Sequence, residues 1–223
     1  MKLSIRPAAI VACAIAATAL STPAAAVPLT AILSGTVYDA YGPDAFGLPS
    51  ASLASLPFVG SFIYDTTPLP GQTRTTDTLS DYIVGSGAAS PVLRVSLTLN
   101  DQTLSSTDFT GSFASTSLGN QAFYYAEWIW DDGGLHHSAE LALRVVAGDY
   151  IPASLDAAYT SPPGGALGDG ILRIITWNDS HSIDDQTILQ FDVTSADVPE
   201  PASVLVLATG LMGLALRRRN PPA

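Results

Sequence analysis

The stretch AFYYAEWIWDDGGLHHSAELALRVV, residues 122–146, has the pattern of a β-hairpin. Apolar and polar side chains alternate on both sides of Asp132-Gly133, a dipeptide that favours a two-residue turn. If this turn closes a type I′ hairpin, Asp131 faces Gly134 and one face of both strands is apolar. That face holds Tyr124, Ala126, Trp128, Trp130, Leu135, His137, Ala139, Leu141, Leu143 and Val145. We expect it to lie in the core.

The opposite face of the hairpin is polar and carries two carboxylates. In this register Glu127 opposes Ser138, which places Glu140 diagonally from Glu127 at roughly 7–8 Å. Carboxyl pairs a few ångströms apart can hydrolyse glycosides. An open strand face, however, encloses no pocket that would raise the pKa of one of them. We therefore expect a solvated face on which Glu140 neighbours Arg144.

The same period of two recurs elsewhere in the chain. Residues 93–99 alternate apolar and polar side chains and end at the turn-forming pair Asn100-Asp101. Two further segments repeat the pattern, and their apolar-face positions are Phe109, Gly111 and Phe113, and Leu189, Phe191 and Val193. These segments predict half-buried strands.

Residues 171–177 are apolar on both faces, which is typical of a strand inside a sheet. Segments rich in Gly, Pro and Ser separate the predicted strands, and residues 49–56 offer at most a turn or two of helix. The predicted body, residues 27–197, is therefore all-β, either an antiparallel β-sandwich or a partly open barrel.

Charge is distributed unevenly along the 223 residues. Between residues 27 and 198 there are 19 acidic residues against four arginines, a net charge of −15. Binding to phosphate depends on Lys and Arg, so this composition excludes a nucleic-acid-binding protein. The hydrophobic content of 47% is high enough for a packed core.

The N-terminus has the three parts of a secretory signal peptide. Lys2 and Arg6 form the positive region, residues 8–20 the apolar region, and three alanines ending at Ala26 the cleavage site. Cleavage between Ala26 and Val27 by signal peptidase would make residues 1–26 the signal peptide.

A lipoprotein signal is the alternative, because residues 10–13, Ile-Val-Ala-Cys, resemble a lipobox. The apolar segment before Cys13 is short for that purpose, and the apolar run continues past it. Cleavage after Ala26 leaves no cysteine, and with it no disulfide, thiolate nucleophile or Cys-ligated metal.

The C-terminal stretch VPEPASVLVLATGLMGLALRRRN, residues 198–220, joins a short apolar run to a basic cluster. Residues 202–216 would form a transmembrane helix about 22 Å long, shorter than the roughly 30 Å hydrocarbon core. Arg217, Arg218 and Arg219 should stay in the cytoplasm. The signal peptide independently places the body outside, so both ends predict one topology.

Pro199, Glu200 and Pro201 precede this run, and their prolines keep the backbone extended. Pro-Glu-Pro, a short apolar helix and a basic cluster, in that order, resemble the PEP-CTERM sorting signal of Gram-negative bacteria. The resemblance implies that exosortase, an integral-membrane cysteine peptidase, processes residues 198–223. The three motif residues would then be recognition residues of a substrate. An ordinary single-span anchor is the alternative.

The body carries a second resemblance. The segment VGSFIYDTTP, residues 59–68, is similar to a strand and loop of a β domain common among exported PEP-CTERM proteins. The similarity extends over residues 35–68 and implies no established activity.

Asp-rich loops are the candidate metal ligands. The segment WNDSHSIDDQ offers oxygen donors in Asn178, Asp179, Asp184 and Asp185, and calcium takes six to eight oxygens. The spacing does not match an EF-hand loop, and turn-forming Asp and Asn residues are the simpler interpretation. We expect no obligatory cofactor.

Aromatic and imidazole side chains offer two further hypotheses. Trp177 is a candidate carbohydrate ligand, whereas Trp128 and Trp130 are predicted to face the core. His136 and His137 point to opposite faces of a strand and so cannot share a zinc ion.

These features predict an exported protein without catalysis of its own. It would pass through the inner membrane with its body in the periplasm and end at the cell surface or in the extracellular matrix. The alternatives are a carbohydrate- or calcium-dependent binding module, with extracellular polysaccharide as a partner, and a polysaccharide hydrolase.

Overall fold

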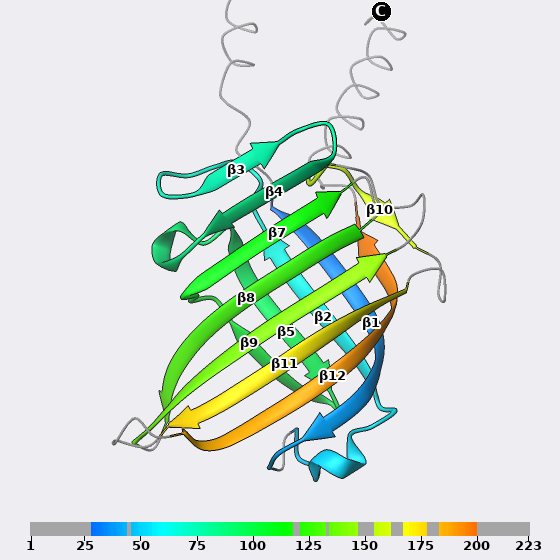
Figure 1. Cartoon of the computed structure of the whole chain (residues 1–223), viewed down its shortest axis with the longest axis vertical. Helices are drawn as coiled ribbons and strands as arrows, with labels where there is room; N and C mark the ends of the chain where they lie inside the picture. Colours follow the sequence, from blue (N-terminus) through cyan, green and yellow to red (C-terminus); the bar gives the residue numbers. More distant parts are fainter. Residues whose placement is uncertain are drawn as a thin grey trace, which may run out of the picture.

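The computed structural model of the chain describes one antiparallel sheet (Figure 1). The described residues are 28–43, 46–117, 121–132, 134–146, 154–161, 167–177 and 183–199. Within them the sheet has twelve strands, which run in the order β3-β4-β7-β8-β9-β11-β12-β1-β2-β5-β6, with β10 paired to β12. The predicted all-β class is confirmed.

The strands are β1 (Leu29–Tyr41), β2 (Pro57–Tyr64), β3 (Thr73–Thr76), β4 (Ser80–Gly85), β5 (Val92–Leu99), β6 (Gln102–Ser106), β7 (Gly111–Ser117), β8 (Gln121–Asp132), β9 (Leu135–Val146), β10 (Tyr159–Thr160), β11 (Leu167–Trp177) and β12 (Ile183–Val198). Two 3-10 turns accompany them, η1 (Ser50–Ser52) and η2 (Gly87–Ala89). The first of these lies in the segment where the sequence predicts a turn or two of helix.

The sheet curls over itself and encloses the core. Figure 1 shows β7, β8, β9, β11 and β12 as one curved layer, with β1, β2 and β5 crossing behind it. The rings of Phe62 in β2 and Tyr124 in β8 lie 5.5 Å apart, so the two layers pack face to face. Aromatic residues that bury large areas, including Phe58 and Phe191, fill the space between them.

This half-barrel corrects one of the two predicted architectures. β1 pairs with β12 on one side and with β2 on the other, so a single sheet replaces the two sheets of a sandwich. Register shifts at Ser34/Gly35 and Val37/Asp39 mark the bend, as bulges increase local twist. A Cβ added at Gly35 would lie 1.8 Å from the Asp192 carbonyl oxygen, which explains the glycine there.

The β8–β9 hairpin has the predicted faces in a different register. Its pairing ends at Asp132 opposite Leu135, so the turn lies one residue later than predicted. Gly134 takes a φ of 87°, which suits glycine. The shift moves facing partners by two positions and leaves the faces unchanged. The predicted core positions are buried from Tyr124 to Trp128 and from Ala139 to Val145. Nearer the turn the prediction is wrong for Leu135, which is 37% exposed, and Trp130 and His137 are only partly buried.

Two other strand predictions need correction. In β5 a register shift inserts an extra residue, so Val92 is 1% exposed and Leu93 is 39% exposed, although the rest of the alternation holds. In β7 the core positions are Ser112, Ala114 and Thr116. Phe113 therefore lies on the outer face, where its ring stacks on Phe123 with centroids 5.0 Å apart.

The predicted central strand and the alternation at residues 189–193 are confirmed. β11 lies between β9 and β12 in the middle of the sheet, and Leu189, Phe191 and Val193 are buried. The predicted signal-peptide and C-terminal helices lie outside the described residues. Within the described ranges no helix is long and apolar enough to cross a membrane.

Candidate functional site

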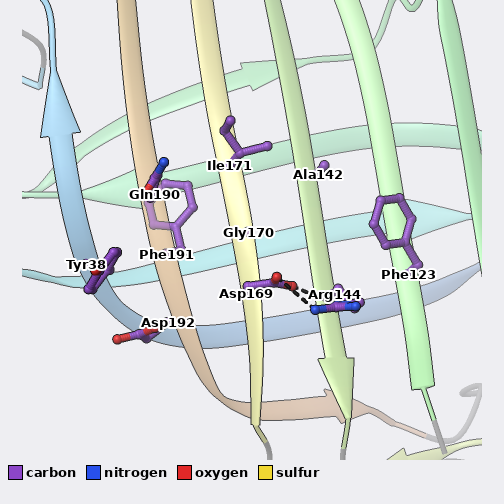
Figure 2. Close-up of a pocket in the computed structure, with 10 residues that line it drawn as sticks. All are labelled: Tyr38, Phe123, Ala142, Arg144, Asp169, Gly170, Ile171, Gln190, Phe191 and Asp192. Carbon is purple, nitrogen blue, oxygen red and sulfur yellow. Dashed lines mark hydrogen bonds and ion pairs between the residues drawn. The ribbon is translucent and has the colours of Figure 1, made fainter. Parts of the chain in front are cut away.

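A groove of about 610 Å³ crosses the outer face of the sheet (Figure 2). It extends over β8, β9, β11, β12 and β1, which are consecutive neighbours in the sheet. Its lining residues are Tyr38, Phe123, Ala142, Arg144, Asp169, Gly170, Ile171, Gln190, Phe191 and Asp192.

An ion pair lies at the middle of the groove. Arg144 Nε donates to Asp169 Oδ1 at 2.8 Å, and Nη2 donates to Asp169 Oδ2 at 2.9 Å. The two residues face each other in the β9–β11 pairing, so the backbone register brings the side chains together. This bidentate geometry holds the guanidinium and the carboxylate in one plane. Both side chains are exposed, so the pair contributes little stability.

Aromatic rings stand at the two ends of the groove, as Figure 2 shows. Phe123 is held by its stack with Phe113. Tyr38 is 65% exposed. The register shift between Val37 and Asp39 leaves Tyr38 without a partner in the β1–β12 pairing. The bulge thus presents a large ring to solvent at the end of the groove.

Polar side chains line the groove between these rings. Gln190 and Asp192 lie two positions apart on β12, so both side chains project from the same face of the sheet. Among the described residues no hydrogen bond or ion pair engages the carboxylate of Asp192. Ring faces combined with polar groups at fixed positions suit a ligand that has apolar faces and hydroxyl edges.

The two glutamates lie elsewhere on the outer face. Glu127 and Glu140 face each other directly across β8 and β9, not diagonally as predicted, because of the register shift. Arg173 Nη1 donates to Glu140 Oε2 at 3.2 Å. The predicted neighbour Arg144 pairs with Asp169 instead, because the β9–β11 register places Arg173 beside Glu140.

A tyrosine completes this carboxylate cluster. The hydroxyl of Tyr125 donates to Glu127 Oε2 at 3.2 Å. Burial, followed by the charges of Glu127 and Glu140, raises the pKa of Tyr125 to about 12. The phenol therefore remains a hydrogen-bond donor at neutral pH.

The two adjacent histidines of β9 have different surroundings. His136 is exposed, and its Nδ1 lies 2.6 Å from Oδ1 of Asp131 in the facing strand. His137 is half-buried, its Nδ1 lies 3.0 Å from Thr176 Oγ1, and its ring stacks on Trp130. Alternation along the strand places them on opposite faces, as predicted.

The three tryptophans differ in how far they are buried. Trp128 is buried in the core, and Trp130 packs against the core while remaining partly exposed. Trp177 is half-buried at the end of β11, where it pairs with His136 and Ile183. Its role as a carbohydrate ligand stays a prediction.

The predicted calcium ligands fall partly outside the described residues. Asn178 and Asp179 lie outside them, and Asp184 is part of β12. Asp185 is exposed, and its Oδ1 accepts a hydrogen bond from the backbone N–H of Gln186 at 2.8 Å. In the part of the chain that the structure describes, no group of three or more His, Cys, Asp or Glu side chains could hold a metal ion. Calcium binding stays a prediction.

The processing sites lie at the borders of the described chain. Pro199 follows β12 directly and is exposed. The remaining predicted residues lie outside the described ranges; these are Ala26, Val27, Glu200, Pro201, Arg217, Arg218 and Arg219.

Sequence reasoning missed the groove. Its residues come from five strands that are far apart in the sequence, and only the order of strands in the sheet aligns them. The sequence offered one indication of the groove: several strands carry aromatic, charged or amide side chains at positions that face outward. Without the order of strands, that signal does not join Tyr38 to Phe123.

Comparison with known families identifies the tail. Residues 197–219 match the family model described as the PEP-CTERM protein-sorting motif. No curated protein and no solved structure matches the chain. The chain thus carries the sorting motif predicted from its C-terminal sequence, which marks it as an exported protein that exosortase sorts. The resemblance of the body to a β domain of such proteins stays a prediction.

Proposed function

We propose that this protein is an exported, non-catalytic β domain that exosortase releases from the inner membrane for use at the cell surface or in the extracellular matrix. The observation that carries the proposal is the coincidence of two boundaries. The last described strand, β12, ends at Val198, and the sorting motif begins at residue 197. Processing beyond that point would leave the described sheet intact.

The end of β12 is well anchored to the body. Val198 is buried and pairs with Tyr159 of β10. Thr160 Oγ1 donates to Asp197 Oδ1 at 2.5 Å, and the backbone N–H of Ser161 donates to the carbonyl of Ala196 at 2.8 Å. Pro199, by contrast, is exposed. A peptidase could therefore engage the chain directly after the domain without unfolding it.

The path of the chain also suits a protein with a signal at each end. β1 and β12 are antiparallel neighbours, with Ile32 opposite Asp197. The start of β1 and the end of β12 consequently lie at the same end of the sheet. A body in this arrangement can be held at the membrane by both signals without distortion.

The surroundings of the titratable groups favour a non-catalytic role. Glu140 is paired with Arg173, and Glu127 accepts from Tyr125. The His136–Asp131 pair lies on an exposed surface, with side-chain exposures of 49% and 77%. Such open positions do not exclude water, which limits electrostatic stabilisation of a transition state.

A charge-neutral substitution in the motif tests the proposal. Glu200→Gln should keep the chain in the membrane fraction, because the Pro-Glu-Pro tripeptide loses its carboxylate, whereas the wild-type body should reach the surface or the medium. Glu127→Gln makes the same chemical change on the outer face and should leave sorting unchanged. Fractionation followed by immunoblotting measures both. Retention of both the wild-type and the Glu200→Gln chain in the membrane would contradict the proposal and favour a plain anchor, and equal release of both would contradict recognition of Glu200.

A further inference from the structure

We propose that the outer-face groove binds a linear, uncharged polysaccharide chain. This inference goes beyond the proposed function, since sorting by exosortase does not require a ligand. It rests on the geometry of the groove, on the aromatic rings at its two ends and on its charge.

The groove is a straight track across the strands. Sheet pairing places Phe123 opposite Arg144, Arg144 opposite Asp169, and Asp169 opposite Asp192. Figure 2 shows these side chains in one row, with Tyr38 at its end on β1. Four strand-to-strand steps of about 4.8 Å give the row a length of about 19 Å. That length fits several units of an extended chain better than a single small molecule.

The rings at the two ends provide apolar contact surfaces. Tyr38 is the more exposed of the two, and Phe123 is fixed in place by its stack on Phe113. A ring that is already ordered loses little entropy when a ligand packs on it. Pyranose rings carry C–H groups on their faces and hydroxyl groups on their edges. They can pack on such rings while their edges stay hydrogen-bonded.

The polar groups between the rings match those edges. The bidentate pair uses Nε and Nη2 of Arg144, and within the described residues Nη1 donates no hydrogen bond. Gln190 offers an amide, and Asp192 a carboxylate that accepts only. Sugar hydroxyls both donate and accept, so the hydroxyls along a sugar chain can pair with the guanidinium, the amide and the carboxylate. A purely apolar ligand would leave them unpaired at a cost.

Charge decides between classes of polysaccharide. Two carboxylates, from Asp169 and Asp192, and one guanidinium, from Arg144, line the groove, and the body around it is strongly acidic. A uronic-acid-rich or sulfated chain would meet like charge, which slows encounter and weakens binding. The charge of the groove and of the body therefore favours an uncharged chain.

The test uses the full chain, purified in mild detergent, on an array of linear glycans from disaccharides to hexasaccharides. Uncharged glucan, mannan and xylan series are compared with alginate and pectin fragments. We expect binding to at least one uncharged series, with affinity rising with length. Tyr38→Ala and Phe123→Ala should each weaken it by about tenfold or more. Tyr38 is exposed, so its variant keeps the test valid even if Phe123→Ala fails to fold.

Matched controls lie on the same strands outside the groove. Tyr41→Ala on β1 and Ile129→Ala on β8 remove exposed apolar side chains and should leave binding unchanged. Trp177 lies eight residues along β11 from Asp169, about 26 Å away, so Trp177→Ala should also bind normally.

Four results would overturn the inference. These are no binding to any uncharged series, stronger binding to alginate or pectin fragments, and binding that survives both groove variants or is lost in Trp177→Ala. None of them depends on exosortase. A failure here would leave the proposed function standing, and failed sorting would leave glycan binding measurable.

Discussion

Asp81 is a fully buried carboxylate that joins separate parts of the chain. Its Oδ2 accepts from Arg74 Nη2 at 2.6 Å and from the backbone N–H of Leu155 at 3.0 Å, and its Oδ1 accepts from Thr76 Oγ1 at 2.9 Å. Arg74 also pairs with Asp156, at 2.7 Å. The β3–β4 hairpin is thereby fixed to the segment before β10. Breaking a buried pair of this kind leaves an uncompensated charge.

Asp81→Asn should therefore lower the free energy of unfolding at pH 7 by about 1–3 kcal/mol. Burial acts to raise the pKa of Asp81, but the hydrogen bonds from Arg74, Leu155 and Thr76 outweigh it and lower that pKa. The wild-type contribution is present above the unfolded-state pKa of about 3.9. It is lost as the pH falls through the folded-state value. Wild type and variant should thus converge in acid.

Urea unfolding between pH 7 and about pH 2 measures this difference, because the contribution is lost only below the unfolded-state pKa. The backbone amides of Leu79 and Ser80 lower the pKa of Asp77, which affects both proteins equally and cancels in the comparison. Asp156→Asn is the control; its carboxylate is 57% exposed, so it should cost less than about 1 kcal/mol. A constant difference between wild type and Asp81→Asn across this range would show that Asp81 does not act through its charge.

At the scale of elements, the β5–β6 hairpin depends on a turn with two left-handed residues. Asn100 and Asp101 have φ angles of 50° and 58°, and Leu99 pairs with Gln102, as in a type I′ turn. Asp101→Gly should leave stability unchanged or raise it by up to about 1 kcal/mol, because glycine adopts positive φ freely. Asp101→Val should lower it by about 1–2 kcal/mol. Thermal unfolding measures both, and equal effects of the two variants would contradict this account of the turn.

The strands themselves show what a sequence pattern can predict. Alternation identified the buried faces of β8, β9 and β12, because burial of apolar area depends only on which side a residue points to. It failed at Leu93, where a bulge reverses the alternation, and at Phe113, whose aromatic partners come from another strand. The β8–β9 register moved by two positions because either glycine after Asp132 could occupy the turn.

At the scale of the whole molecule, local sequence patterns could not predict the order of the strands. A sandwich and a half-barrel require the same alternating strands and differ only in whether β12 pairs with β1. That contact joins the two ends of the domain, and no spacing between neighbouring residues encodes it. The groove depends on the same contact, since Tyr38 enters it from β1. The sorting tail was predictable because its three parts are contiguous in the sequence.

The central claim is that exosortase removes the tail and leaves the β domain intact. The most direct test is the intact mass of the protein from the cell envelope and from the medium, in a strain with exosortase and in one without it. We predict a species that begins at Val27 and ends between Pro199 and Pro201, present only when exosortase is present. Its fold should match that of the full chain, because β12 is complete at Val198. A chain that retains residues through Ala223 in both strains would contradict the account and identify the tail as a permanent anchor.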